Sequence, residues 1–201
     1  MAVAGTPADS VLYALDVDGV VPDLVVSGVN SGQDIGTFVP LSGTLGAART
    51  AARREIPAIA VSAGNLEDSD HVTAAALARD EVLSRLDDVG AGENDEQVVV
   101  SLNVPTCPVG TAVRGVLDVA PAVTFPAGTN GLDLVLDCGS TAPASTATDD
   151  ATAMGHRLRR SFDHPRRPLT GGRRPPATVR PGRHPDFPVP GHRTPAAPRT
   201  H

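Results

Sequence analysis

Two loops carry the residue types that hold phosphate groups and metal ions. The first runs from Ser27 to Gly36 and contains Asn30, whose side-chain oxygen can ligate a hard cation such as magnesium or manganese. The second, Ser42-Gly43-Thr44, leads into an alanine-rich segment with high helix propensity. Such a helix N-terminus offers unpaired N–H groups, hydroxyls and the positive end of the dipole, which suit a phosphate. Taken alone, each loop also fits simple turns, with Ser42 only capping the helix.

The elements expected along residues 1–154 place both loops at the carboxyl ends of strands, where open α/β sheets bind their ligands. Apolar runs and helical periodicity alternate along the chain, which predicts an α/β fold with a mainly parallel sheet. Helices are expected over residues 9–21, 45–55 and 69–88, strands over 24–26, 58–62, 98–102, 113–119 and 132–136, and loops over 27–44 and 139–153.

Composition excludes several classes of protein. The chain has 201 residues, of which 40% are hydrophobic and 2% aromatic, and it contains two cysteines. No apolar run reaches the roughly 18 residues of a membrane span, so no span is expected. The glycines and prolines follow no collagen period, and two cysteines are too few for a disulfide scaffold. A soluble globular domain remains.

Charge divides the chain in two. All 17 basic residues are arginine, and most of them lie in residues 155–201, together with many prolines and almost no aliphatic residues. This segment cannot bury enough apolar area to offset the entropy of ordering, so it is predicted to be a disordered tail after a folded domain of residues 1–154. A one-base shift of GC-rich codons for residues 155–160 can spell Ala-Thr-Gly-Tyr-Val-Val, a plausible strand, which suggests a frameshift near Met154. Nucleic-acid binding by the arginines is not favoured, because no aromatic residues are interleaved with them.

At these residues the sequence resembles the SurE family of 5′/3′-nucleotidases, also called survival proteins. The family motifs S-G-[IV]-N-x-G-x-N-x-G, S-G-T-[VL]-x-A-A and I-P-A-[IL]-A-V-S match Ser27–Gly36, Ser42–Ala48 and Ile56–Ser62. The family's G-T-P-x-D turn matches Gly5–Asp9, and its N-V-P strand end is present at Asn103–Pro105. The resemblance implies a Rossmann-like three-layer sandwich and a metal-dependent phosphatase that hydrolyses nucleoside monophosphates.

The resemblance also implies roles for particular residues. Asn30 would ligate the divalent ion, magnesium or manganese, and Ser42, Gly43 and Thr44 would cradle the phosphoryl oxygens. The substrate loops would further include Gly28, Gly32, Asp34, Gly36, Thr6 and Asp9.

Two departures from the family pattern affect the expected activity. The family's N-D-D-G metal motif lies tens of residues before the G-T-P-x-D turn, whereas this chain begins four residues before it. The Asp pair, a metal-binding Ser and the first strands are therefore expected to be missing, which leaves the catalytic residues unknown and the activity impaired. In addition, Asp34 stands where the family has Asn, and a carboxylate should repel a phosphate dianion unless it is protonated or takes a metal.

Two other functions remain open. A non-catalytic fragment could bind a phosphate or nucleotide without turning it over. Alternatively, the sequence Asp16-Val17-Asp18-Gly19 fits the nucleophile motif of haloacid-dehalogenase-type phosphatases, with Asp16 attacking phosphorus and Asp18 as the acid/base. Against this second function, the chain has no lysine to neutralise the phosphate, and Pro22 follows the motif where a helix is needed.

The remaining candidates concern the single histidine of the predicted domain, the cysteines and the assembly. His71 lies at a predicted helix start and is expected to be solvated. Cys107 and Cys138 can form one disulfide, which would favour an exported protein, or remain as two thiols in the cytoplasm, where most of the family resides. Relatives in the family are homodimers or tetramers that exchange C-terminal segments, an arrangement that the altered C-terminus puts in question here.

Overall fold

Three parallel strands form one side of the sheet. The computed structural model describes residues 2–64, 69–91, 99–108, 113–125, 134, 136–155, 158–161 and 163–164, all within the unit formed by residues 1–167. Strands β1 (Val25–Ser31), β2 (Ala58–Ala63) and β3 (Val99–Val104) pair in the order β1-β2-β3, with Val25 opposite Ala58 and Ala58 opposite Val99. β2 and β3 are buried along their whole length, as expected for strands covered on both faces.

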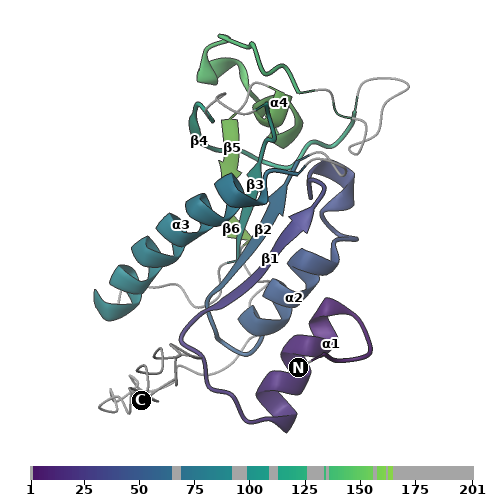
Figure 1. The fold of residues 1–201 in the computed structure, drawn as a ribbon, viewed down its shortest axis with the longest axis vertical. Coiled ribbons are helices and arrows are strands. Elements are labelled where there is room, and N and C mark those ends of the chain that lie inside the picture. The colour runs from purple at the N-terminus through teal and green to yellow at the C-terminus, as the bar shows by residue number, and fades with distance from the viewer. Residues whose placement is uncertain are drawn as a thin grey trace, which may run out of the picture. The chain divides into compact units, whose positions relative to one another are not determined.

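Helices cover the two faces of this sheet (Figure 1). On one face, α2 (Gly43–Ala52) buries Leu45 and Ala48 against Ala58 and Ala60 of β2. On the other, Ala74 and Ala78 of α3 (His71–Ala91) pack against Ile59, Val61 and Ala63 of β2. The alternation of the β2 side chains between the two helices follows from the two-residue period of a strand. The three-layer α/β arrangement predicted from the sequence is confirmed.

The chain enters the sheet through a short helical segment. Helix α1 (Pro7–Leu12) is capped by Thr6 and begins two residues before the predicted start, because Thr6 and Asp9 form a capping box and Pro7 occupies the first turn. A π-helical turn, Tyr13–Val17, continues from it. The predicted helix over 9–21 is thus correct in type and displaced at both ends.

The first strand is longer than predicted. The sequence suggested a loop from Ser27, yet β1 continues to Ser31 and pairs Asn30 with Ser62 and Ser31 with Ala63, after a register shift between Ser27 and Asn30. The extension was not predicted because residues 27–31 are mostly polar and contain glycine, whereas the strand pairing is made by the main chain. Gly36–Phe38 then forms a 3₁₀ turn before α2.

The region after β3 differs most from the prediction. β4 (Gly115–Asp118) falls within the strand predicted over 113–119. Of the strand predicted over 132–136, Leu134 and Leu136 are not in a strand, and the other three positions lie outside the described residues. The predicted loop over 139–153 instead contains a 3₁₀ turn, Ala144–Thr146, and the start of α4 (Asp150–Gly155).

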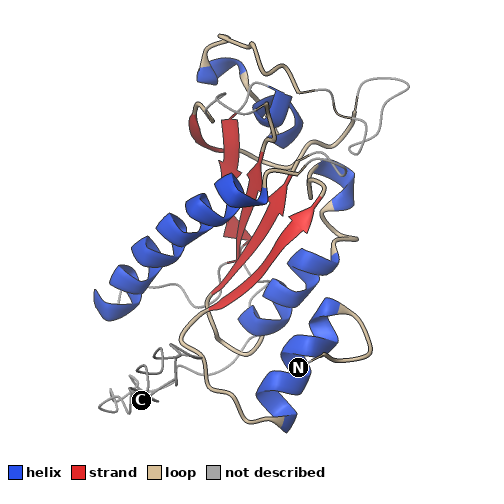
Figure 2. Ribbon diagram, viewed as in Figure 1, coloured by secondary structure: helices blue, strands red, loops and turns tan. Residues whose placement is uncertain are grey.

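Two strands lie within the segment predicted to be a disordered tail. β5 (Leu158–Ser161) pairs parallel to β4 and antiparallel to β3, and β6 (Asp163–His164) pairs antiparallel to β3 (Figure 2). Backbone pairing does not require apolar side chains, so a composition argument missed these arginine-containing strands. Residues 156, 157, 162 and 165–201 of the predicted tail lie outside the described residues.

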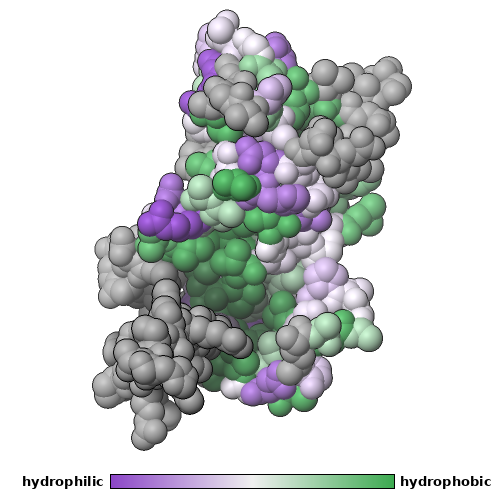
Figure 3. All heavy atoms as spheres, in the orientation of Figure 1, coloured by the Kyte–Doolittle hydropathy of each residue, from purple (hydrophilic) through white to green (hydrophobic). Residues whose placement is uncertain are grey.

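The α3 face of the sheet is incompletely covered. Val26 of β1 and Leu83 of α3 are 45% and 47% exposed. Figure 3 shows hydrophobic surface over the region where β1 and α3 lie in Figure 1. β1 is also an edge strand of the described sheet. In the part of the chain that the structure describes, no helix combines the length and the hydropathy needed to cross a membrane.

Candidate phosphate site at the carboxyl edge of the sheet

One carboxylate oxygen joins the two loops singled out in the sequence. Oδ2 of Asp34 accepts a hydrogen bond from the Ser42 hydroxyl at 2.7 Å and another from the Ser62 hydroxyl at 2.9 Å. Ser42 precedes α2 and Ser62 lies near the end of β2, where it pairs with Asn30 of β1. The strand end that carries Asn30 and the start of α2 are therefore linked through Asp34 at the same edge of the sheet.

Ser42 caps α2. Its Oγ accepts a hydrogen bond from the Leu45 amide at 3.0 Å, while its hydroxyl proton goes to Asp34. Both functions of the hydroxyl are thus occupied, as in the alternative in which Ser42 serves as a helix cap. The amide N–H groups of Gly43 and Thr44 have no hydrogen-bond partner among the described residues. These two donors and the helix dipole are what the start of α2 offers to an anion.

The backbone around Asn30 allows β1 to approach β2 closely. Gly28 has φ +125°, and a methyl group there would lie 2.2 Å from the Val61 carbonyl oxygen. Only glycine fits this position. Asn30 follows, and its Nδ2 donates to the Gly32 carbonyl at 2.9 Å. Because the amide nitrogen makes this bond, the amide oxygen Oδ1 points away from it, and no described residue donates to that oxygen.

A buried asparagine on the neighbouring strand fixes the main chain of Asp34. The Asn103 side chain is fully buried; its Oδ1 accepts from the Asp34 amide at 2.8 Å and its Nδ2 donates to the Asp34 carbonyl at 3.1 Å. Nδ2 also reaches the Ser101 hydroxyl at 3.3 Å. An amide that both donates to and accepts from one residue holds that residue in a single orientation. Asn103 thereby aims the Asp34 side chain at Ser42 and Ser62.

The far end of the loop is held by Asp150. This carboxylate is fully buried and accepts hydrogen bonds from the Gly36 and Ala122 amides, each at 2.7 Å. Gly36 has φ +54° and lies against the Phe125 ring, which a methyl group at Gly36 would meet at 2.5 Å. Asp150 was assigned to a polar loop by the sequence, yet it connects α4 with the candidate site.

The G-T-P-x-D turn lies beside the start of α2. The Asp9 carboxylate accepts from the Thr6 amide at 2.7 Å and from the Thr6 hydroxyl at 2.8 Å. The amide bond, followed by the hydroxyl bond, holds the pKa of Asp9 below its usual value. A methyl group at Gly43 would lie 3.2 Å from the Pro7 side chain. Thr6 and Asp9 therefore shape the turn that packs against Gly43.

Among the described residues, Arg49 is a cation whose charge interacts with that of Asp34. Its guanidinium donates to the Val39 carbonyl at 3.0 Å and is half-buried. Burial lowers the pKa of Arg49 below its usual value, Arg53 adds to this effect, and the charge of Asp34 opposes it. Arg49 thus partly balances the carboxylate at the site.

The side-chain oxygens of Asn30 and Asp34 suit a cation that is also bound by waters and substrate better than one that is enclosed by protein ligands. Asn30 Oδ1 and Asp34 Oδ1 are hard oxygen donors, and the hydroxyl bonds to Asp34 end on the other oxygen, Oδ2. Among the described residues no group of three or more His, Cys, Asp or Glu side chains could hold a metal ion. Magnesium is commonly held by one or two protein oxygens together with waters and substrate phosphates, and the donors present fit that mode.

A second polar pair occurs at the same edge. The Ser31 hydroxyl and His71 Nε2 lie 2.9 Å apart, at the end of β1 and the start of α3. His71 is exposed, as predicted, but it has this partner. Asp70 caps α3 by accepting from the Thr73 amide at 2.9 Å, and hydrogen bonds from the Thr73 side chain and backbone lower the pKa of Asp70.

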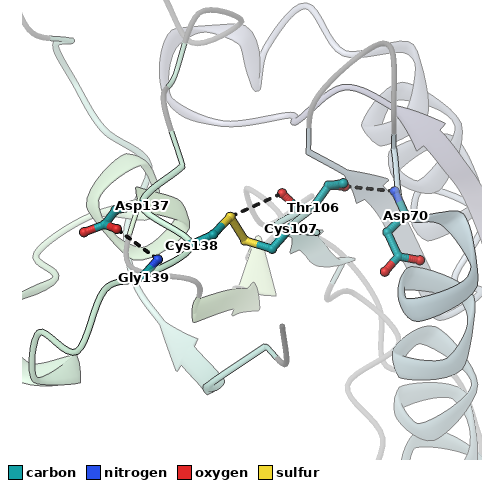
Figure 4. Close-up of a disulfide and its surroundings, with 6 residues drawn as sticks. All are labelled: Asp70, Thr106, Cys107, Asp137, Cys138 and Gly139. Atoms are coloured by element: carbon teal, nitrogen blue, oxygen red, sulfur yellow. Dashed lines mark hydrogen bonds between the residues drawn. A yellow bond between two sulfur atoms is a disulfide. The ribbon is translucent and has the colours of Figure 1, made fainter. Parts of the chain in front are cut away.

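The loop that follows β3 is anchored next to this cap by a disulfide. Cys107 and Cys138 are bonded, and the described residues contain no free cysteine. Figure 4 shows the bond beside Thr106, whose hydroxyl accepts from the Asp70 amide at 2.9 Å. Of the two states left open by the sequence, the structure has the disulfide, and it lies one residue from the contact that holds the start of α3.

The residues that fit the haloacid-dehalogenase motif do not lie at the carboxyl edge of the sheet. Asp16 lies in the π-helical turn and forms an ion pair with Arg54, which follows the C-terminal end of α2. Ser42 precedes the opposite end of that helix, which at ten residues is about 15 Å long. The hydrogen bonds from Arg54 lower the pKa of Asp16. Asp16 is thus engaged in an ion pair at a distance from the candidate site.

Comparison with known proteins agrees with this geometry. The family model described as "Survival protein SurE" matches residues 1–124. The chain belongs to the SurE family. Proteins called 5′-nucleotidase SurE are similar to it: 36% identical over 111 residues in Fervidobacterium nodosum, and 44% over 108 residues in Desulfatibacillum aliphaticivorans. Each match covers 53% of this chain and 41% of the relative.

A longer match within the SurE family and a solved structure extend the comparison. The 5′-nucleotidase SurE of Wolbachia pipientis wMel is 37% identical over 134 residues, which cover 64% of this chain and 52% of that protein. The chain therefore spans about half the length of the curated SurE relatives it matches. The crystal structure of the SurE protein from Aquifex aeolicus has a TM-score of 0.62 and 20% identity, and the match covers 81% of this chain and 67% of that one. The SurE fold is shared.

Proposed function

We propose that the chain binds the phosphate of nucleoside monophosphates at the start of α2 and hydrolyses them to nucleoside and phosphate, with magnesium or manganese. The observation that carries this proposal is the Asp34 carboxylate, whose Oδ2 accepts hydrogen bonds from both Ser42 and Ser62. This carboxylate connects the start of α2 with the strand end that carries Asn30. The names of the SurE relatives, 5′-nucleotidases, support the substrate class.

The residues of this chain contribute mainly to binding and orientation. The N–H groups of Gly43 and Thr44 donate to the phosphoryl oxygens, where the helix dipole also favours negative charge. Asn30 Oδ1, and Asp34 Oδ1 if needed, would hold the divalent ion. When bound, such an ion neutralises phosphoryl charge and supplies an activated water. Hydrolysis forms a bond from the water oxygen to phosphorus, breaks the ester bond, and leaves the proton on the nucleoside oxygen.

Few oxygen atoms among the described residues of the site can hold a divalent cation for this reaction. Asn30 provides a neutral oxygen, and Asp34 is the single carboxylate joined to the site by the bonds described above. A cation held by so few protein charges is bound weakly without substrate. We therefore expect slow turnover, with binding of phosphate or nucleotide more readily measured. The small number of protein charges available to the cation also favours the alternative, a phosphate-binding protein without turnover.

A phosphatase assay with a matched binding measurement tests the proposal. Adenosine monophosphate is incubated with the full chain and manganese or a chelator, and released phosphate is measured; calorimetry follows binding in parallel. We expect metal-dependent phosphate release that Asn30→Ala reduces at least tenfold. Asp23→Asn, at the opposite end of β1, should leave it unchanged. Binding without release at any metal concentration would favour the non-catalytic alternative, and no binding would overturn both.

We also propose a compartment and an assembly. The Cys107–Cys138 bond fits a protein that matures where disulfides form, as in export. The edge position of β1 and its exposed residue Val26 fit self-association into the homodimer or tetramer that the family resemblance implies. Thiol titration of the native protein, expected to find no free thiol, and light scattering, expected to exceed the mass of one chain, test the two statements.

A further inference from the structure

The hydrogen bond between Ser31 and His71 is not used by the phosphate site described above. The two side chains lie 2.9 Å apart across 40 residues of sequence, and both are exposed. Ser31 is the last residue of β1 and His71 the first of α3. A hydroxyl and an imidazole placed together in this way present donors and acceptors to solvent at the edge of the sheet.

Strand register places this pair on the other face of the sheet from the start of α2. Asn30 pairs with Ser62, whose hydroxyl reaches Asp34 on the α2 side. Ser31 pairs with Ala63, which packs in the hydrophobic cluster under α3. Consecutive residues of a strand point to opposite faces. The Ser31–His71 pair and the Gly43–Thr44 amides therefore lie at the same carboxyl edge, on its two sides.

The backbone that carries His71 is anchored independently of any ligand. The Asp70 amide, next to His71, donates to the Thr106 hydroxyl at 2.9 Å. Thr106 precedes the Cys107–Cys138 disulfide, and its carbonyl oxygen lies 3.9 Å from the Cys138 sulfur (Figure 4). The start of α3 is thus tied to a cross-linked loop. A group fixed in this way loses little conformational entropy when a ligand binds to it.

A nucleotide that places its phosphate at the start of α2 has its sugar next to that phosphate, at the same sheet edge. We propose that Ser31 and His71 bind the ribose hydroxyls of the nucleotide on the α3 side of this edge, an inference that rests on the proposed phosphate site. A ribose diol offers two hydroxyls that each donate and accept, which match a hydroxyl and an imidazole that do the same. The pair then distinguishes ribonucleotides from phosphate esters without a sugar diol.

Calorimetric titration of the full chain tests the proposal with three probes: adenosine monophosphate, its 2′,3′-dideoxy analogue and inorganic phosphate. The native protein should bind adenosine monophosphate more tightly than the dideoxy analogue. Ser31→Ala and His71→Gln should each weaken adenosine monophosphate about 3- to 10-fold, the effect of losing one or two neutral hydrogen bonds. Both variants should leave phosphate affinity unchanged and should no longer distinguish the two nucleotides. Val72→Ala, at an 82% exposed neighbour, is the matched control.

The outcomes separate this inference from the proposed function. If phosphate and nucleotide both bind but the variants keep the discrimination, or lose affinity for all three probes equally, the ribose assignment is wrong. If the native protein binds none of the probes, the phosphate site itself fails, and the inference fails with it. The ¹⁵N resonances of His71 in the unmutated protein provide a second readout. They should shift with adenosine monophosphate and remain in place with phosphate or the dideoxy analogue, and the opposite pattern would overturn the proposal.

Discussion

Replacing Asp34 by asparagine tests whether the charge of this carboxylate lowers the affinity of the candidate site for phosphate. Both hydroxyl bonds to Asp34 end on one oxygen, Oδ2, from Ser42 at 2.7 Å and from Ser62 at 2.9 Å. An amide oxygen also accepts two hydrogen bonds, so an asparagine whose Oδ1 takes the place of Oδ2 keeps both. The main-chain bonds to Asn103 are not affected by the change. The substitution therefore removes a negative charge while it preserves the links between α2, β1 and β2.

The expected gain in phosphate affinity follows from this charge. A dianion held by the Gly43 and Thr44 amides is repelled by the Asp34 carboxylate. For an assumed separation of about 7 Å, the repulsion is about 1.2 kcal/mol at the dielectric constant of water and about 4.7 kcal/mol at the value of about 20 that applies near a protein surface. The lower limit corresponds to a rise in phosphate affinity of at least about sevenfold for Asp34→Asn. Replacing two charge-assisted hydroxyl bonds by neutral ones should lower the free energy of unfolding by up to about 2 kcal/mol.

The assay is calorimetric titration with inorganic phosphate at low salt and with a chelator present, so that screening and metal binding do not obscure the charge effect. Urea unfolding of the same variants measures the stability change. Asp23→Asn makes the same charge change at the other end of β1 and should leave phosphate affinity within twofold of the native value. An Asp34→Asn protein that is folded and binds phosphate no better than the Asp23→Asn protein would refute the assignment of phosphate to the start of α2.

Three further changes test the framework around the site. Asp150→Ala should lower the free energy of unfolding in urea by about 3 kcal/mol, because two buried amides each lose a 2.7 Å bond to a carboxylate; a loss below about 1 kcal/mol would contradict this role. Replacing Cys107 and Cys138 by serine should cost about 3.5 kcal/mol, from the entropy of a loop closed over 31 residues, and unchanged thermal stability would argue against the bond. Asp70→Ala should cost about 1 kcal/mol at neutral pH through loss of the α3 cap. Since the folded pKa of Asp70 is lowered, the native protein holds this advantage above about pH 4 and loses it as the pH falls through the lowered pKa, so the stability difference from Asp70→Ala should disappear in acid.

The parts of the fold that the sequence predicted are those in which local patterns and packing agree. The apolar runs that became β2 and β3 are buried on both faces, and the alanine-rich segment after Ser42 became α2. Ser42 and Asn30 could be named because their residue types and their expected positions near strand ends point to ligand chemistry, whereas Asp34 was named from the family resemblance. The α/β fold with its mainly parallel sheet followed from the alternation of these elements, and the three-layer arrangement followed from the family resemblance.

The missed features depend on contacts between distant segments. Asn103 and Ser62 are polar residues near the ends of apolar strands, and nothing in this pattern indicates that both contact Asp34. Asp150 stands in a run of small polar residues, so nothing local distinguishes it from a surface acid, yet it is fully buried. Likewise, β5 is formed by backbone pairing with β3 and β4, which the arginine-rich composition gave no reason to expect.

Paramagnetic broadening by manganese tests the shared metal and phosphate site most directly. Amide spectra of the full chain are recorded with adenosine monophosphate while manganese is added in small amounts. The amides of the Asn30 strand end and those of Gly43 and Thr44 should broaden first and together, and Asn30→Ala should reduce this effect at both segments. Broadening that reaches one segment without the other, or that begins in the acidic turn around Asp16, would contradict a single site formed by both loops.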